Sequence, residues 1–137
     1  MRLLQLHCEY FKYWATKYAL KTPIEHAELG EIHEFKNVMV VLVTAEKNDT
    51  PDTARNAIVA VRKNFDEVKA DSLLIYPYAH LSSDLAQPSV ALTILKEMES
   101  YSKQQGIEVA RAPFGYYKAF ELKCYGHPLA ELSKTIT

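Results

Sequence analysis

The chain has 137 residues, of which 48% are hydrophobic and 24% are charged, and its formal net charge is −1. This composition predicts one globular domain over residues 1–137 and argues against a protein that coats nucleic acid. The longest apolar run, residues 38–43, is too short to cross a bilayer, and the amino terminus lacks a signal-peptide core. We therefore expect a cytoplasmic protein with no membrane segment.

The first third of the chain is typical of two strands around an irregular stretch. The leucine-rich segment 2–8 is mostly apolar, as expected of a strand that is covered on both faces. Residues 9–36 are polar, rich in aromatics and without a clean period, and Pro23 and Gly30 interrupt them. This pattern favours a hairpin or a long excursion over a helix. The valine-rich segment 37–46 is the clearest buried strand.

Two helices alternate with the following strands. The first begins after Thr50, a hydroxyl N-cap that is followed by proline at the first helical position. Its apolar stripe comprises Ala54, Ala57, Ile58, Val61, Phe65 and Val68. Residues 72–76 form the next strand. A second helix begins at residues 87–88 and ends before Gly106. Its expected inward stripe comprises Val90, Ile94, Leu95, Met98 and Tyr101.

The last third predicts strands at residues 107–110 and 117–125 and a short terminal helix that begins at His127 and Pro128. In the second of these strands apolar and charged residues alternate, so one face is expected to be solvated. Strands intercalated with helices predict a layered α/β (α+β) domain. In such a domain a mixed sheet packs against about three helices.

The charge is spread unevenly along the chain. Residues 110–137 contain four basic and two acidic side chains. This excess indicates either a modest basic surface for one end of a polyanion or an ordinary scatter of charges.

Two segments that follow strands offer candidate chemistry. His80 comes after a strand that ends at Pro77, and Lys118 comes directly after Tyr116 and Tyr117. Ligands of α/β domains bind where strands end, because a rigid scaffold holds a loop that can be shaped there. A neutral imidazole can accept a proton or hold a water, and an ammonium can bind a phosphate or a developing oxyanion. The residues alone leave a purely structural role open for both.

Other chemical groups lack the partners that catalysis or metal binding requires. The serines at 82–83 beside His80 lack the GxSxG turn of a hydrolase, and Cys124 falls on the inward side of its strand. The two cysteines have no CxxC spacing, and His26 and His33 lack companion ligands. No glycine motif for phosphates is present. We expect no disulfide framework, no metal and no cofactor.

Several motifs together resemble the amino-terminal editing domain of archaeal threonyl-tRNA synthetase. They are YPYAHLSS at 76–83, QPSVA at 87–91, APFGYYKAF at 112–120 and GHPLAELS at 126–133, with MRLLQLHCEYF at 1–11 and VTAEK at 43–47. The resemblance spans essentially the whole chain. It implies a fold like that of the D-aminoacyl-tRNA deacylases and a homodimer.

The resemblance also assigns candidate site residues. His80 and Lys118 match the polar active-site pair of the family, and Glu131, near the start of the expected terminal helix, matches its acidic member. The matching substrate-binding positions are Thr44, Ala45 and Glu46 at one strand end, Pro77, Tyr78 and Ala79 along the backbone that holds the aminoacyl group, and Phe114 and Tyr117 beside the terminal adenosine. Tyr116 is a further substrate-binding candidate. The family often has serine, valine and phenylalanine at positions 44, 45 and 78, and these differences bear on the volume of the pocket.

The family hydrolyses L-serine that is wrongly esterified to threonine tRNA. The implied partners are therefore threonine tRNA, through its 3′-terminal aminoacyl-adenosine, and the catalytic domain of the synthetase in cis or in trans. In this family the ribose 2′-hydroxyl of the substrate is thought to organise the water. His80 and Lys118 are then expected to position and polarise rather than to attack.

Two alternatives remain for the function. One is a D-aminoacyl-tRNA deacylase, against which the absence of the glycine–proline chirality signature counts. The other is a non-catalytic module that binds tRNA ends.

Overall fold

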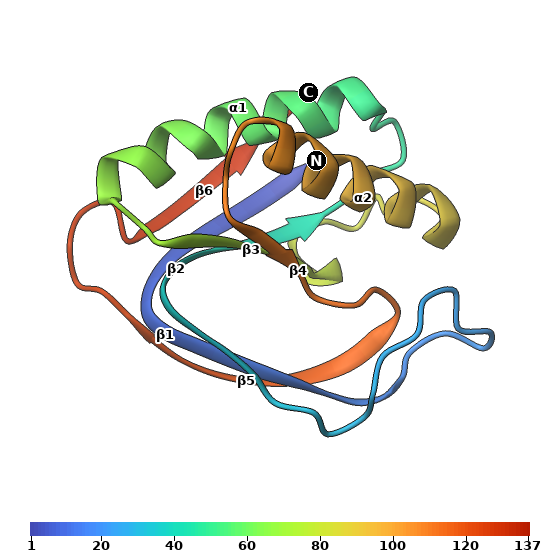
Figure 1. Ribbon diagram of the computed structural model, residues 1–137. Coiled ribbons are helices and arrows are strands. Elements are labelled where there is room, and N and C mark those ends of the chain that lie inside the picture. The colour runs from blue at the N-terminus through green and yellow to red at the C-terminus, as the bar shows by residue number, and fades with distance from the viewer.

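The structure, a computed structural model, describes residues 1–137 as one mixed sheet with two helices (Figure 1). The strands are β1 (Arg2–Tyr18), β2 (His33–Thr44), β3 (Ser72–Pro77), β4 (Val109–Arg111), β5 (Tyr116–Cys124) and β6 (Glu131–Thr135). The helices are α1 (Pro51–Val68) and α2 (Pro88–Gln104), and a short 3-10 turn, η1, covers Ala79–Leu81. The strand order is β4-β3-β2-β1-β5, and β6 pairs with β1 beside this path.

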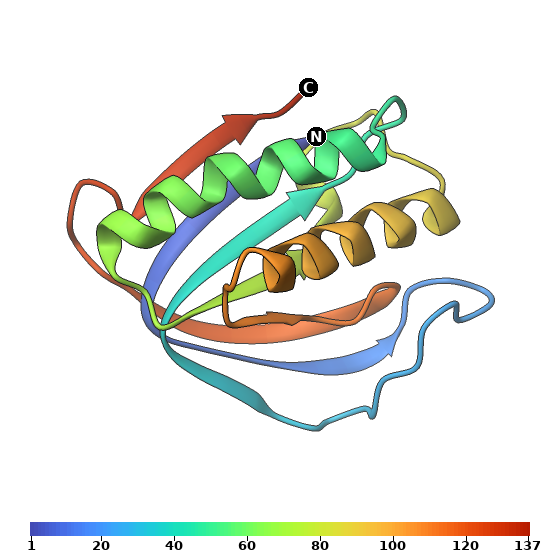
Figure 2. The same cartoon turned by 45° about the horizontal axis from the view of Figure 1, so that its top comes forward.

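Strand β1 pairs with other strands along both of its edges. One edge is antiparallel to β2, and the other carries β6 beside residues 2–6 and β5 beside residues 8–18. Register shifts in the β1–β5 ladder mark bulges, and the outer half of β1 curves beneath the helices together with β5 (Figure 2). The expected excursion over 9–36 is therefore the outer half of the β1–β2 hairpin and its loop, residues 19–32.

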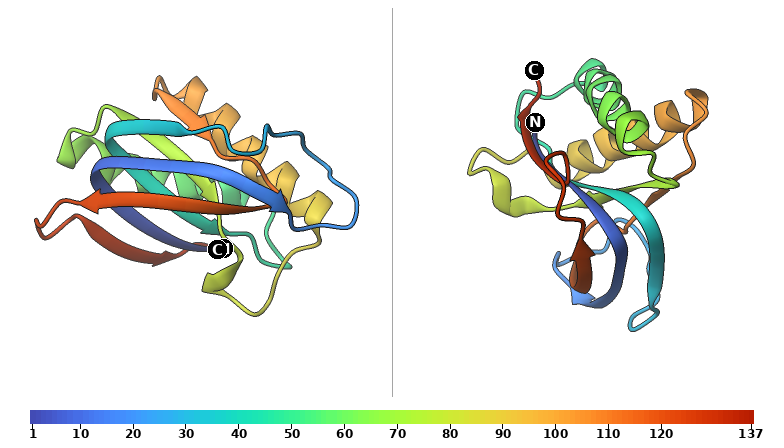
Figure 3. Two further views of the ribbon diagram at one scale, coloured as in Figure 1. Left: turned by 90° about the horizontal axis from the view of Figure 1, so that it is seen from below. Right: turned by 90° about the vertical axis from the view of Figure 1, so that its left-hand side faces the viewer.

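Both helices lie on the same face of the sheet, over β1, β2 and β3 (Figures 1 and 3). Strands β2, β3 and β4 are parallel, and α1 and α2 are the crossovers between them. Because such crossovers are right-handed, successive ones in the same direction place their helices on one face. The main core fills the space between the helices and the sheet. A smaller core on the opposite face contains Phe11, Tyr13 and Tyr76 and lies behind the candidate site.

Helix α1 confirms its predicted start and stripe. The Thr50 hydroxyl accepts a hydrogen bond from the Thr53 amide, and the Thr53 hydroxyl accepts one from the Thr50 amide, which completes a capping box. The apolar stripe faces the main core. The helix ends at Lys69, which adopts a left-handed conformation with φ 56°.

Helix α2 also follows its prediction, apart from one residue. It begins at Pro88 and ends before Gly106, whose φ of +75° suits the residue after a helix terminus. The prediction was wrong for Val90, which is 42% exposed. Ala91 and Leu92 are buried at this end of the helix instead.

The expected terminal helix was also wrong, because the segment after His127 and Pro128 forms strand β6. Strand β5 separates from β1 at Cys8 and leaves the backbone groups of residues 2–6 without partners. Pairing with β6 satisfies these groups, which a helix would leave open. The mixed sheet is as expected, but the helices number two rather than about three. Neither helix combines the length and the apolar character that a membrane crossing requires.

Candidate functional site

The two segments that carry His80 and Lys118 line one cavity. It has a volume of about 350 Å³ and lies between the end of β3 with η1 and the start of β5. Its lining comprises Ala19, Leu20, Tyr76, Pro77, Tyr78, Ala79, His80, Phe114, Gly115, Tyr116, Tyr117, Lys118 and Phe120. Aromatic rings therefore dominate its walls, and Lys118 and His80 are the basic groups among them.

A second, smaller cavity adjoins the first. Its volume is about 70 Å³, and it is lined by Val43, Thr44, Ala45, Tyr78, Ala79, Leu85, Ala86, Ala91, Leu95 and Phe114. Tyr78, Ala79 and Phe114 line both cavities. The site thus consists of a large aromatic compartment and a small, mostly apolar compartment that share one wall.

The backbone of the shared wall is fixed by β2. The Tyr78 amide donates to the Val43 carbonyl at 2.8 Å. The Thr44 hydroxyl donates to the Tyr78 carbonyl and accepts from the Leu81 amide at 3.3 Å. Thr44 therefore contributes to the site by holding residues 78–81 in place. Neutral hydrogen bonds of this kind contribute about 1 kcal/mol each.

Lys118 is held inside the aromatic cavity with its ammonium turned away from bulk water. Its Nζ atom donates to the carbonyls of Pro113 at 2.9 Å and Tyr116 at 3.3 Å, and it lies 5.0 Å from the centre of the Tyr76 ring. Burial lowers the pKa of Lys118 to about 8. Such an ammonium can stabilise negative charge that develops on a bound substrate.

His80 occupies the opposite wall on η1. Its side chain is exposed, and its ring lies edge-on to Tyr78, with ring centres 5.0 Å apart. This exposure leaves the imidazole accessible to a ligand in the large compartment. The sequence-based expectation that His80 and Lys118 face a common opening is consistent with this geometry.

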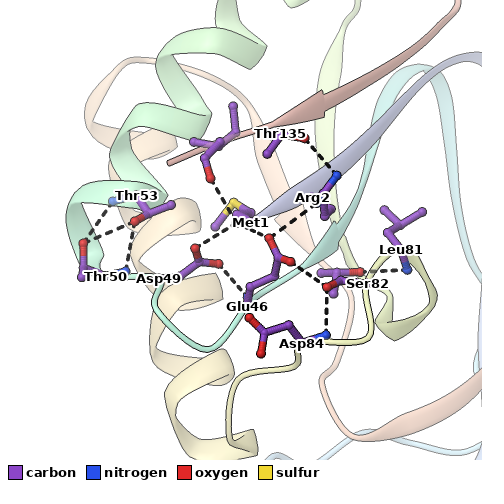
Figure 4. Close-up of polar contacts among 12 residues, drawn as sticks. Met1, Arg2, Glu46, Asp49, Thr50, Thr53, Leu81, Ser82, Asp84 and Thr135 are labelled. Atoms are coloured by element: carbon purple, nitrogen blue, oxygen red, sulfur yellow. Dashed lines mark hydrogen bonds and ion pairs between the residues drawn. The ribbon is translucent and has the colours of Figure 1, made fainter.

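Glu46 lies near the site, but its carboxylate contacts other residues of the protein rather than either cavity. One carboxylate oxygen lies 2.8 Å from the Met1 ammonium, and the other accepts from the Ser82 hydroxyl at 2.6 Å (Figure 4). Ser82 in turn accepts from the Asp84 amide. Glu46 lines neither cavity. Its carboxylate ties the loop after η1 to the start of β1.

Glu131 is not brought into the site. It lies on β6 opposite Leu6, is exposed and lines neither cavity.

The two cysteines have raised pKa values. Burial, and then the Glu131 charge, raise the pKa of the Cys124 thiol. Burial also raises the pKa of Cys8, to about 12. Both thiols are therefore protonated at neutral pH.

One wall of the site was missed by the sequence reasoning. Ala19 and Leu20 come from the loop 19–32. The sequence of this loop has no hydrophobic period, so it did not indicate where the loop lies in the fold. Of the four basic residues late in the chain, three are already engaged within the protein. Arg111 is buried against Glu25, Lys123 pairs with Glu9, and Lys118 lies in the cavity.

A wider depression of about 760 Å³ lies elsewhere, around His7 and His127. Its two histidines are already paired: Nδ1 of His7 lies 2.7 Å from Nε2 of His127, and Nε2 of His7 lies 2.7 Å from the Asn37 amide oxygen. The Leu129 amide donates to Nδ1 of His127. The aromatic site, with its accessible His80 and desolvated Lys118, is therefore the better candidate.

Comparison with known proteins gives a match over the length of the chain. Residues 1–136 match the family model described as the archaea-specific editing domain of threonyl-tRNA synthetase. The chain is 44% identical over 139 residues to the threonine–tRNA ligase of Thermococcus onnurineus, covering 99% of this chain and 22% of that protein. It is 46% identical over 136 residues to the threonine–tRNA ligase editing subunit of Saccharolobus solfataricus, covering 99% and 34%. It thus spans about a fifth to a third of these relatives.

A solved structure, the c-Myc DNA unwinding element binding protein, has the same fold. The TM-score is 0.71 at 12% identity, and the match covers 98% of each chain. At this identity the likeness concerns the fold alone. It confirms the expected mixed α+β architecture.

Proposed function

The chain belongs to the archaea-specific family of threonyl-tRNA synthetase editing domains, and on this premise we propose that it hydrolyses the ester of L-serine with threonine tRNA. The observation that carries the proposal is the pair of adjoining cavities, about 70 and 350 Å³, with a common wall at Tyr78, Ala79 and Phe114. The small compartment suits a small amino acid. The large aromatic one suits the nucleoside to which it is attached.

The size of the small compartment suits discrimination by exclusion. Threonine differs from serine by one methyl group, and a synthetic pocket that accepts threonine cannot reject the smaller serine strongly. A difference of this size is worth about 1–3 kcal/mol. A second, tighter site that admits serine and excludes the extra methyl supplies the missing discrimination. Ala45, Ala91 and Leu85 bound the compartment in which that methyl would have to fit.

The reaction needs no protein nucleophile. A water oxygen attacks the ester carbon, the bond to the ribose 3′-oxygen breaks, and that oxygen takes a proton to become the 3′-hydroxyl. The Lys118 ammonium stabilises the negative charge that develops on the former carbonyl oxygen. His80 and the backbone of residues 77–79 orient the substrate and the water. The ribose 2′-hydroxyl of the substrate completes the arrangement by holding the attacking water.

The aromatic compartment receives the terminal adenosine of threonine tRNA. The rings of Phe114 and Tyr117 offer flat surfaces against which a base can stack, which is worth about 1–3 kcal/mol per base. The Tyr116 hydroxyl bonds to the Glu25 carbonyl and the Ala27 amide, so only its ring is available to a ligand. Tyr117, by contrast, is 56% exposed.

The chain acts in the cytoplasm with a synthetase catalytic domain, in cis or in trans, which supplies the mischarged tRNA. It forms a homodimer. The outer edges of β5 and β6 pair with no other strand and are available for such contact.

The proposal is tested by incubating the protein with L-seryl-, L-threonyl- and D-aminoacyl-tRNA and following loss of the aminoacyl group. We expect rapid loss of L-serine alone, relative to spontaneous hydrolysis. Loss of D-amino acids without loss of L-serine would assign the site to a D-aminoacyl-tRNA deacylase. Retention of all three, together with tight binding of tRNA ends, would assign it to a binding module.

A further inference from the structure

Contacts between the loop 19–32 and the turn before β5 converge on Glu25. Its carboxylate accepts two hydrogen bonds from the Arg111 guanidinium, both at 2.7 Å, and one from the Phe114 amide at 2.9 Å. Its carbonyl accepts from the Tyr116 hydroxyl at 2.9 Å. One residue of an otherwise irregular loop thus holds the strand β4, the turn and the start of β5 together.

The ion pair of Glu25 with Arg111 is largely buried. The side chains are 17% and 10% exposed, and Arg111 also donates to Glu99 on α2 at 3.1 Å. Burial by itself would raise the pKa of Glu25, but the hydrogen bonds from Arg111 and from the Phe114 amide hold it below its ordinary value. The carboxylate is therefore ionised at neutral pH, and the three side chains carry a net charge of −1. A bidentate pair in this setting fixes one geometry.

That geometry defines a wall of the aromatic cavity. Phe114, whose amide Glu25 binds, lines both compartments. The loop and the turn meet closely at Gly115, where an added Cβ would lie 2.9 Å from the Leu20 side chain. The Ala19 amide also donates to the Gly115 carbonyl at 2.8 Å. Movement of the carboxylate would therefore move both faces of this wall.

Glu25 also acts on Lys118 through its charge. Burial lowers the pKa of Lys118 to about 8, and the negative charge of Glu25 opposes that shift. The other ionisable side chains around the cavity are His80 on η1, Tyr76 and Tyr78 at β3, and Tyr116 and Tyr117 on β5. None of these is a carboxylate.

We propose that Glu25 is a positioning residue of the editing site: its buried carboxylate sets the place of the turn at residues 113–114, whose Pro113 carbonyl binds the Lys118 ammonium and whose Phe114 side chain lines both compartments. The expected effect of Glu25 on turnover rests on the proposed function. Its expected effect on the Phe114 turn and on Lys118 does not depend on the substrate. Because Glu25 touches neither compartment, it acts through Phe114 and Lys118.

The first test needs no substrate. The ionisation of Lys118 is followed by NMR of its side-chain methylene groups, assigned by comparison with Lys118→Met, in the wild type, Glu25→Gln and Glu28→Gln. Glu28 is the matched control, since it lies on the same loop, is 73% exposed and pairs only with the exposed His26. We expect Glu25→Gln to lower the titration midpoint by about half a unit, as for a screened charge–charge interaction, and Glu28→Gln to leave it unchanged.

The second test uses turnover of seryl-tRNA. Glu25→Gln should raise KM, because the Phe114 turn is loosened, and should lower kcat more at pH 8 than at pH 6.5, where Lys118 regains its proton. An unchanged midpoint together with unchanged amide shifts of Phe114 and Gly115 overturns the inference. A wild type that turns over no aminoacyl-tRNA, with the midpoint shifted as expected, overturns the proposed function and leaves the inference standing.

A further variant covers the case in which Glu25→Gln does not fold. The double substitution of Glu25 and Arg111 by methionine removes the charges and fills the space with apolar atoms, a replacement of buried pairs that is often neutral for stability. It leaves no carboxylate at position 25 to act on Lys118. Because one negative and one positive charge are removed together, the Lys118 midpoint should change little, whereas the amide shifts of Phe114 and Gly115 should move; unchanged amide shifts contradict the inference.

Discussion

The ammonium nitrogen of Lys118 lies 5.0 Å from the centre of the Tyr76 ring, inside a cavity whose lining includes no carboxylate. The face of a tyrosine ring attracts a cation electrostatically, and the attraction grows when the cation is desolvated. Tyr76 itself is 2% exposed and its hydroxyl has no partner in the protein. Lys118 is therefore charged at neutral pH without a counter-ion in contact, which is a suitable state for binding a developing negative charge.

Substitution of Lys118 by methionine should reduce kcat/KM for seryl-tRNA by about 100-fold or more, as loss of a group that stabilises an oxyanion does. The fold should be retained, because methionine preserves most of the aliphatic stem and removes a desolvated charge. Thermal unfolding and deacylation rates measure the two effects. A variant with unchanged activity would remove Lys118 from the site.

The pH dependence follows from the lowered pKa of Lys118, about 8. If the ammonium is the active form, kcat/KM corrected for spontaneous hydrolysis should fall as the pH rises through 8. The unfolded state holds the proton up to about pH 10.4, so the unfolding free energy should rise between pH 8 and that value. Lys118→Met should show neither change. An activity that keeps rising above pH 9 contradicts this assignment.

Substitution of Thr44 by valine tests the role of the backbone at residues 78–81. It removes the hydroxyl that binds the Tyr78 carbonyl and the Leu81 amide. We expect a loss of about 1–3 kcal/mol in unfolding free energy and a lower kcat, because partly buried groups lose their partners. Thr93→Val is the control, since Thr93 is exposed on α2 and bonds only to the Ser89 carbonyl. Equal effects of the two substitutions would argue against a special role for Thr44.

Truncation of Leu85 to alanine should widen the small compartment, which this side chain lines. Threonyl-tRNA should then become a better substrate, with the preference for serine falling about tenfold or more, the value of one methyl-sized contact. Stability should change little, because Leu85 is 48% exposed. Val90→Ala, at a residue that is 42% exposed and outside the cavity, is the control. An unchanged preference would place the discrimination elsewhere.

A substrate that ends in 2′-deoxyadenosine tests the contribution of the RNA. If the 2′-hydroxyl holds the attacking water, seryl-tRNA without it should be bound with similar affinity but hydrolysed at least 100-fold more slowly, as for loss of a positioned catalytic group. Undiminished turnover would indicate that His80, rather than the 2′-hydroxyl, activates the water. Affinity is measured with the same tRNA in uncharged form.

Much of the fold could be predicted from local sequence. The start of α1 at Thr50 and the end of α2 before Gly106 depend on capping and on backbone conformation within a few residues. The prediction failed for β6, whose local pattern resembles a helix start after Pro128. Its strand form is decided by the free edge of β1, more than a hundred residues away.

The sequence by itself determined the family, the mixed sheet with the helices α1 and α2, and the two motifs that carry His80 and Lys118. These depend on periodicity, caps and long matching motifs, all of which can be read along the chain. Only the tertiary structure decided what each side chain touches. Glu25 and Arg111 form an ion pair although they are 86 positions apart, and the Glu46 carboxylate forms an ion pair with the Met1 ammonium. Such pairs arise from the curvature and register of the sheet, because buried charges must find partners wherever the packing brings them together.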